Sequence, residues 1–233
     1  DRIAATALRN GLEGIGINPK EALYQDKWHG HEIRVPFEAD FMVLNTLVAA
    51  ELALVLGVDT AEIVRKIEKL VPVPGRFEMI TKDLIPTVVI DYAHTPEALE
   101  ATLMSARKLK GKCDLIVVFG CGGERDKGKR PLMGKVAEDC ADFSVVTSDN
   151  PREEPAMSII EEILSGLETN DFVVEVNRKD AIELALRRAN KNDVIVIAGK
   201  GHETTQEISG RLFDFKDREV AESLISEIFS EED

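Results

Sequence analysis

The sequence contains few cysteines, few aromatic residues and no long apolar run. Its three cysteines, Cys113, Cys121 and Cys140, do not have the spacing of a metal site. Such sparse usage is typical of reduced thiols, so we expect a cytoplasmic protein. No apolar run is long enough to cross a bilayer and no signal-peptide pattern is present, so we expect no membrane insertion.

Basic residues are also scarce. The chain has 29 Lys and Arg against 43 Asp and Glu, which gives a formal charge of −14. A surface of this charge repels nucleic acid, so we expect no nucleic-acid partner. Anionic ligands are expected only where basic side chains gather locally. The length of 233 residues suggests one large domain or two small ones.

The first third of the sequence is predominantly helical. The stretch WHGHEIRV, residues 28–35, is compatible with a short pair of strands. Apolar residues at helical spacing predict a helix over 41–56 and a second one over 60–70, with Thr60 as its N-cap. The segment VPVPGRFE, residues 71–78, then ends the helical part, because its two prolines and glycine cannot continue a helix. We therefore predict a domain boundary at residue 78, with domains 1–78 and 79–233.

The second domain alternates strands with helices. Apolar runs predict strands at 87–91, 115–119, 143–147, 172–176 and 194–198, with helices between them, and a final strand at 212–215 followed by a helix over 217–228. This alternation predicts an α/β fold with a doubly wound, mostly parallel, Rossmann-like sheet. The helical first domain would precede it.

Four of the predicted parallel strands are followed directly by an unusual polar motif. Because the carboxyl ends of parallel strands meet at one edge of a sheet, the motifs predict a single composite site. They are DYAHTP (91–96), GCGGERDKGKR (120–130), SDNPR (148–152) and GKGHE (199–203).

The chemistry of these motifs suits a small zwitterionic ligand. Glycines beside the cations Arg125 and Lys127 allow the backbone to approach an anion closely. Arg152 offers a planar fork to a carboxylate, and Lys200 with Glu203 places both signs of charge in one loop. Simpler interpretations remain open at this stage: a helix-capping pair formed by residues 91 and 94, a solvated basic loop, and ordinary turns at the other two motifs.

Taken together and in this order, the four motifs closely resemble the Mur ligases of peptidoglycan synthesis, and within them the branch that adds meso-diaminopimelate. PGRFE (74–78) and NTLVAA (45–50) also resemble the end of that family's central ATP-binding domain. The resemblance covers the chain from about residue 35 onward. It implies that residues 1–78 are the last part of the ATP-binding domain and that residues 79–233 are the amino-acid-binding domain.

The resemblance implies an ATP-dependent amide ligase with Mg²⁺ as a further cofactor. In such a ligase the D-glutamate carboxylate of UDP-MurNAc-L-Ala-D-Glu is activated as an acyl phosphate, and the amine of diaminopimelate then displaces phosphate. The family's glycine-rich phosphate loop ending GKT or GKS is absent from this sequence. We therefore expect the chain to be part of a longer polypeptide and to be inactive alone, with the magnesium ligands in the upstream part. We also expect a monomer.

The resemblance also assigns roles to individual residues, with no metal ligand among them. The predicted amino-acid site has Arg125, Asp149, Asn150, Arg152, Gly199 and Glu203. The predicted ATP-binding residues are Asn45, Arg76 and Asp91, and the predicted catalytic residues are His94 and Lys127.

Other functions are weighed against this one. Within the enzymes, the alternatives are the lysine-adding Mur ligases and folylpolyglutamate synthase; the pair Asn150 and Arg152 favours diaminopimelate, because a second carboxylate needs a further cation. From a different class, the chain could be a non-catalytic module that binds an amino acid or a nucleotide. A dinucleotide oxidoreductase is disfavoured because the Gly-x-Gly-x-x-Gly fingerprint is missing.

Overall fold

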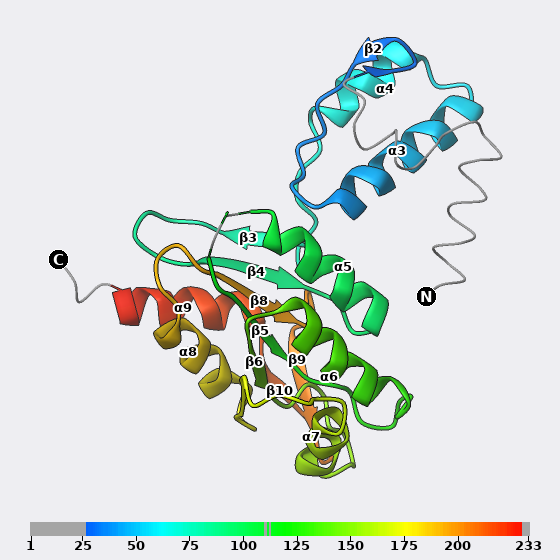
Figure 1. Cartoon of the computed structure of the whole chain (residues 1–233). Coiled ribbons are helices and arrows are strands. Elements are labelled where there is room, and N and C mark those ends of the chain that lie inside the picture. The colour runs from blue at the N-terminus through cyan, green and yellow to red at the C-terminus, as the bar shows by residue number, and fades with distance from the viewer. Residues whose placement is uncertain (1–26, 110, 112, 230–233) are drawn as a thin grey trace. The chain divides into compact units, whose positions relative to one another are not determined.

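The computed structural model describes residues 27–109, 111 and 113–229, and the chain divides into two compact units (Figure 1). The first unit ends at Pro72 and the second begins at Val73. The two units therefore meet before residue 78, where the sequence places the boundary, because Glu78 already pairs with Ile90 in the sheet of the second unit. Residues 1–26, which the predicted first domain includes, lie outside the described residues.

The first unit is a helix pair with a small strand pair. Strands β1 (Lys27–Trp28) and β2 (His31–Glu32) are antiparallel, as the 28–35 stretch predicts. Helices α3 (Asp40–Val55) and α4 (Thr60–Ile67) follow. Asp59, one residue before the predicted Thr60, caps α4 by accepting hydrogen bonds from the two amides at 61 and 62. The buried core of the unit consists of Trp28, Leu47, Ala50, Ile63 and Ile67.

A buried carboxylate ties the strand pair to α3. Glu51 is 5% exposed and accepts a hydrogen bond of 2.7 Å from the indole Nε1 of Trp28. His29 Nε2 lies 2.7 Å from the same oxygen. His29 thus lies at the turn of the strand pair and packs its ring edge-on against Trp28.

The second unit is built on a six-stranded sheet of order β3-β4-β8-β5-β6-β7. All neighbours are parallel except β3 and β4. The five predicted parallel strands are all present, two of them ending slightly earlier than predicted, whereas the antiparallel edge strand β3 was not predicted. The strands are β3 (Glu78–Ile80), β4 (Thr87–Asp91), β5 (Leu115–Phe119), β6 (Phe143–Val146), β7 (Phe172–Val174) and β8 (Val194–Ala198).

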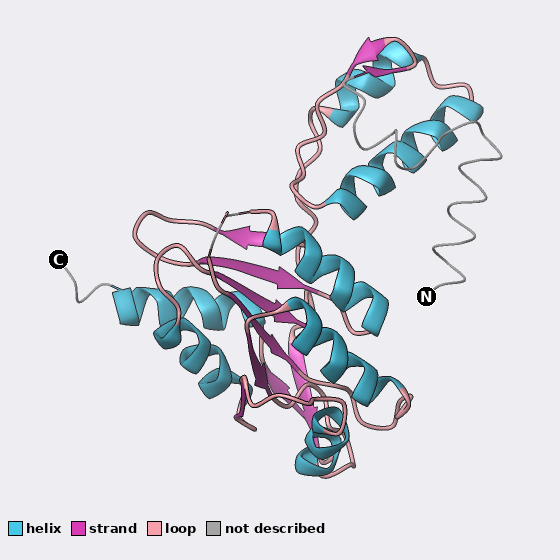
Figure 2. Cartoon of the chain, viewed as in Figure 1, coloured by secondary structure: helices cyan, strands magenta, loops and turns pink. Residues whose placement is uncertain are grey.

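Helices cover both faces of this sheet, so the predicted doubly wound α/β fold is confirmed (Figures 1 and 2). One face carries α5 (Pro96–Arg107), α6 (Lys129–Cys140) and α7 (Ala156–Leu164). The other carries α8 (Arg178–Arg188) and α9 (Asp217–Phe229). The chain runs outward through β5, β6 and β7 and then returns through α8 to place β8 between β4 and β5.

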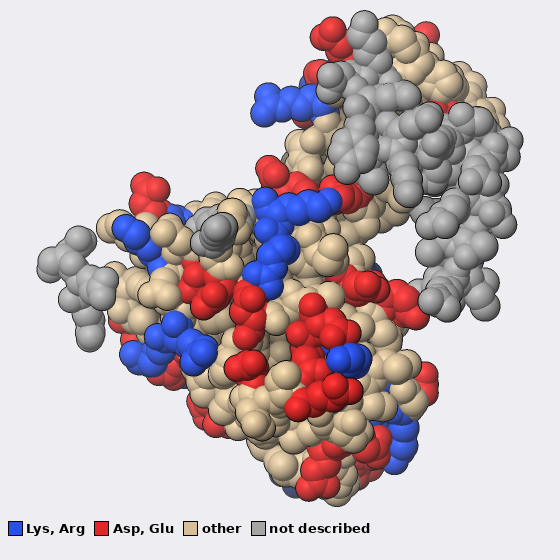
Figure 3. Space-filling view, in the orientation of Figure 1, with Lys and Arg blue, Asp and Glu red and all other residues tan. Residues whose placement is uncertain are grey.

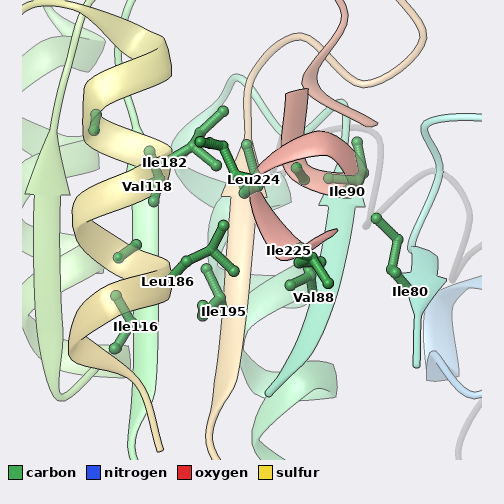
Figure 4. Packing of buried hydrophobic residues seen from close by; sticks show 14 of the residues in the cluster. Ile80, Val88, Ile90, Ile116, Val118, Ile182, Leu186, Ile195, Leu224 and Ile225 are labelled. Atoms are coloured by element: carbon green, nitrogen blue, oxygen red, sulfur yellow. The ribbon is translucent and has the colours of Figure 1, made fainter. Parts of the chain in front are cut away.

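The core lies between the sheet and its helices. Figure 4 shows Ile182 and Leu186 of α8 and Leu224 of α9 pointing toward the side chains of the central strands. The strands β4, β5 and β8 are buried at every position, which explains why their sequences are continuous apolar runs. Burying a side chain of this kind contributes about 1.5–3 kcal/mol, so the sheet is a rigid support for the loops at its edge.

A hairpin is added beside the sheet. Strand β9 (Thr205–Ile208) pairs with β10 (Arg211–Asp214) around Ser209 and Gly210, both with positive φ. The sequence predicted a single strand at 212–215 and missed β9. Two residues of positive φ form the tight turn whose twist matches a hairpin.

Acidic side chains dominate part of the surface. Figure 3 shows several of them over the face of the second unit that α5 and α6 form, in keeping with the formal charge of −14. In the part of the chain that the structure describes, no helix is both long and apolar enough to span a membrane.

Candidate functional site

The four polar motifs follow the carboxyl ends of β4, β8, β5 and β6, which are neighbours in the sheet. They therefore lie along one edge, as the sequence predicts. Backbone hydrogen bonds join the loops: the amide of Gly199 donates to Asp91 O at 3.1 Å, and the amide of Gly123 donates to Asn150 O at 2.9 Å. The loops thus form one connected surface.

Close approach of these loops depends on two glycines. A Cβ on Gly123 would lie 2.0 Å from the carbonyl oxygen of Pro151, so no other residue fits between the loops after β5 and β6. Gly199 has a φ of +113°, and a Cβ there would lie 2.5 Å from Asp149 Oδ2. The predicted site residue Gly199 is thus explained by backbone conformation and space.

Asn150 is the centre of the hydrogen-bond network in the site. Its side-chain Nδ2 donates to Glu203 Oε2 at 2.8 Å. Its Oδ1 accepts from Lys200 Nζ at 3.1 Å and from the backbone amide of Glu207 at 3.0 Å. The amide therefore links the loop after β6, the loop after β8 and the β9–β10 hairpin.

Lys200 lies beneath this network instead of facing a ligand. Its side chain is fully buried, and Nζ donates to Glu203 Oε2 at 2.9 Å as well as to Asn150. The interpretation that Lys200 offers its charge directly to a ligand is therefore wrong, because the ammonium is already paired inside the protein. The signal for Lys200 was present in the GKGHE motif, but burial cannot be seen in a loop sequence.

Glu203 is held in its charged form. Burial alone would raise the pKa of Glu203, but hydrogen bonds from Lys200 and Asn150 bring that pKa below its usual value. Its side chain is 32% exposed. An ionised, partly exposed carboxylate at the edge of the network can receive a ligand ammonium.

Arg152 follows Asn150 in the loop after β6 and is held by contacts with the loop after β5 and with the β9–β10 hairpin. Its φ is +53°, and its Nη1 donates to Gly123 O at 2.8 Å. Its Nε lies 3.3 Å from Glu207 Oε2. The backbone amide of Arg152 also donates to Glu207 O. These contacts fix the guanidinium with 19% of the side chain exposed.

Two basic side chains of the GCGGERDKGKR motif after β5, Lys127 and Arg130, are paired with internal carboxylates. Arg130 is fully buried in the first turn of α6 and is paired at 2.9 Å with both Glu154 and Glu162. Those contacts, above all the hydrogen bonds from Arg130, lower the pKa of Glu154 to about 2. Lys127 lies 3.4 Å from Glu154 but remains 63% exposed. The predicted anion-binding loop is therefore reduced to Arg125, which is exposed, and Lys127.

The alternative interpretation of residues 91 and 94 as a helix-capping pair is wrong, because neither side chain caps α5. Thr95 caps α5 by accepting a hydrogen bond from the amide of Ala98, and Pro96 takes the first helical position. Asp91 is buried and accepts three hydrogen bonds, from the amides of Phe77 and Ala93 and from the hydroxyl of Thr102. Burial raises the pKa of Asp91 despite these donors. A ribose contact would have to share oxygens that already hold the loop together, and it stays a prediction.

Tyr92 is half-buried next to Asp91, and three exposed side chains pack around its ring. The guanidinium of Arg76 lies 4.5 Å from the centroid of the Tyr92 ring. The rings of His94 and His202 lie 4.6 Å and 5.1 Å from the same ring. His94 is exposed, and its Nδ1 lies 2.8 Å from Tyr92 O. Tyr92 and His202 were not predicted, although both belong to the motifs.

The remaining predicted residues have separate positions. Asn45 is exposed on α3 of the first unit, and its role toward ATP stays a prediction. Asp149 is buried, and this burial raises its pKa in spite of the nearby cations Arg178 and Lys200. Its backbone oxygen accepts from Gln206 Nε2 at 2.7 Å, so it anchors the hairpin. No group of three or more His, Cys, Asp or Glu side chains suited to a metal is found among residues 27–109, 111 and 113–229.

These loops define an α/β domain with a candidate ligand site at the carboxyl edge of its sheet. Comparison with known proteins then identifies the family. The sequence profile described as Mur ligase, glutamate ligase domain, matches residues 75–201, more than half of the chain. The chain therefore belongs to the Mur ligase family through this domain.

Several curated relatives share one name. UDP-N-acetylmuramoyl-L-alanyl-D-glutamate–2,6-diaminopimelate ligases of Bacillus licheniformis and Clostridium botulinum are 46% and 44% identical over 198 and 246 residues. These matches cover 84% and 98% of this chain but only 40% and 50% of the relatives. A solved structure with the same name has a TM-score of 0.65 at 37% identity and covers 84% of this chain and 40% of that one. The chain thus spans half or less of the length of these relatives.

Proposed function

We propose that the chain is the acceptor-binding part of an ATP-dependent amide ligase that adds meso-diaminopimelate to UDP-MurNAc-L-Ala-D-Glu. ATP converts the D-glutamate carboxylate into an acyl phosphate, the amine of diaminopimelate attacks its carbonyl carbon, and phosphate leaves. The observation that carries the proposal is the Arg152–Asn150–Glu203 arrangement, in which Asn150 donates from its side-chain amide to the Glu203 carboxylate and accepts from Arg152 at its backbone oxygen. Support also comes from the names of the relatives.

The chain's residues have complementary tasks in this proposal. Glu203 receives an ammonium group of the amino acid, and Arg152 receives a carboxylate through charge-assisted hydrogen bonds. Arg125, which is exposed at the same edge, is available for a second carboxylate. Lys127 stabilises the negative charge that develops on the acyl phosphate, and His94 lies next to the reacting groups.

The ATP side of the site is proposed around Tyr92. An exposed arginine stacked on a half-buried tyrosine fits the face of a nucleoside, and Arg76 and Tyr92 form this arrangement. Asp91 is the further ATP contact that we propose in the second unit, and Asn45 is proposed separately as an ATP contact of the first unit. We assign no magnesium ligand to the described residues; a bound magnesium ion would neutralise phosphate charge.

The Arg152→Ala variant tests the proposed amino-acid site. Diaminopimelate and lysine differ by one carboxylate, and a carboxylate that loses its charged partner typically costs about 2–5 kcal/mol of binding. We expect Arg152→Ala to weaken meso-diaminopimelate by that amount and to change the weaker binding of L-lysine little. Titration calorimetry of the 233-residue chain with both amino acids measures the difference.

Arg187→Ala is the matched control, because Arg187 is an exposed arginine on α8 outside the site. It should leave both affinities unchanged. Equal loss for the two amino acids in Arg152→Ala would show that Arg152 holds the carboxylate they share, and selectivity would then belong to Arg125. Absence of diaminopimelate binding by the unaltered chain would contradict the proposed function.

A further inference from the structure

We infer that Lys200 is a positioning residue of the amino-acid site, which fixes the Asn150 amide and the Glu203 carboxylate in one orientation from beneath. The inference rests on the proposed function for its ligand, but its contacts are independent of that function. Lys200 is not a group that touches the amino acid, because its side chain is fully buried.

Burial of the ammonium is the first step of the argument. A lysine removed from water is stable only when carboxylate or carbonyl oxygens replace its hydration. Lys200 Nζ has two such partners, Asn150 Oδ1 at 3.1 Å and Glu203 Oε2 at 2.9 Å. Both partners belong to the residues that flank the proposed ligand. The charge is therefore located where it can control them.

The orientation of Asn150 is the second step. A side-chain amide can rotate to exchange its oxygen and nitrogen unless its neighbours discriminate between them. Lys200 and the backbone amide of Glu207 are both donors, so only the oxygen of the Asn150 side chain can face them. Nδ2 is consequently directed to Glu203 at 2.8 Å. Without the ammonium, one of the two donors that determine this orientation is lost.

The carboxylate of Glu203 is the third step. Lys200 and Asn150 both donate to its Oε2, and this leaves Oε1 as the oxygen that neither of them holds. Three further charges act on the carboxylate of Glu203. Arg152 favours its ionised form, and Asp149 and Arg178 interact with it electrostatically. Lys200 is the only one of the cations in direct contact with Glu203 among the described residues.

Lys200→Met separates positioning from simple structural support. Methionine retains the length of the side chain but removes the charge. Glu203 then becomes protonated at a higher pH and loses its attraction for an ammonium group. We expect diaminopimelate affinity of the variant to fall by about tenfold or more from pH 8 to pH 5.5, whereas the affinity of the unaltered chain changes little.

Calorimetry over this pH range measures the effect, with Lys216→Met as the control because Lys216 is half exposed and pairs with Glu219 outside the site. Adding Glu203→Gln to Lys200→Met should abolish the pH-dependent part of the loss. An equal weakening at every pH would overturn the inference, since a merely structural lysine acts in that way.

A second measurement does not depend on any ligand. Carbon NMR of the Glu203 carboxyl group should give a pKa below the ordinary glutamate value in the unaltered chain and above it in Lys200→Met. If the unaltered chain binds no diaminopimelate, the proposed function fails, but this titration still tests the role of Lys200. If Lys200→Met does not fold, Lys200→Gln replaces it, because glutamine retains a donor without the charge. A Glu203 pKa at or above its ordinary value in the unaltered chain overturns the inference without any variant.

Discussion

Single residues in this protein act mainly by connecting loops to one another. Asn150 joins three segments through its side-chain amide, and Asp91 joins residue 77 to helix α5 through its carboxylate. Each of these polar groups is buried and satisfied inside the protein. A buried polar network of this kind favours one conformation, because a group that loses its partner is left without water.

Gly123 gives a residue-scale prediction. Because a Cβ at this position would lie 2.0 Å from Pro151 O, Gly123→Ala must push the loops after β5 and β6 apart. We expect a decrease of about 1–3 kcal/mol in the free energy of unfolding, the usual cost of overpacking. Urea unfolding followed by circular dichroism measures it. Gly111→Ala is the control, since nothing lies within 4 Å of a Cβ there; equal stability of the two variants would contradict the close approach.

At the scale of elements, a buried ion pair holds α8, α9 and β8 together. Arg178 at the start of α8 donates to Asp217 at the start of α9 at 2.7 and 2.8 Å, and to Ala198 O at 2.9 Å. Both side chains are fully buried. The pair thereby fixes the end of β8 immediately before the Gly199 loop. The sequence pattern contained no signal for it, since the two residues are far apart in the chain.

Breaking this pair should be costly. Arg178→Met leaves the Asp217 carboxylate buried without its cation, so we expect a loss of about 3–5 kcal/mol in the free energy of unfolding. Removing both charges in Arg178→Met with Asp217→Ala should cost less than Arg178→Met alone. Urea unfolding of the single and double variants decides the matter. A double variant that is less stable than both single variants would show that packing, and not charge, dominates at this position.

An element can be predicted from the sequence when its pattern lies within its own residues. Strands β4, β5 and β8 are buried apolar runs and were predicted to the residue. Strand β3 was missed because three residues pairing at an edge carry no pattern of their own, and β9 was missed although Ser209-Gly210 is a hairpin signal. The motif residues were predicted to share one edge, but the burial of Lys200 and Arg130 depends on partners that are distant in the sequence.

At the scale of the whole molecule, the second unit has a complete sheet with its own core, so we expect it to fold without the first. The connection between the units is exposed: Leu70, Val71 and Val73 are 40%, 73% and 52% accessible. Limited proteolysis should therefore cut between Leu70 and Val73 and leave a resistant fragment that consists of the second unit. Mass spectrometry of the fragments identifies the cut. A resistant fragment that retains α3 and α4 would contradict this division.

The contact of Trp28 with Glu51 has a spectroscopic consequence. The chain contains one tryptophan, and it lies buried in the core of the first unit. Tryptophan emission is therefore a signal from that unit alone, whereas far-ultraviolet dichroism comes largely from the longer second unit. Two optical measurements on the same unaltered sample thus observe different parts of the protein: tryptophan emission reports on the first unit and dichroism mainly on the second.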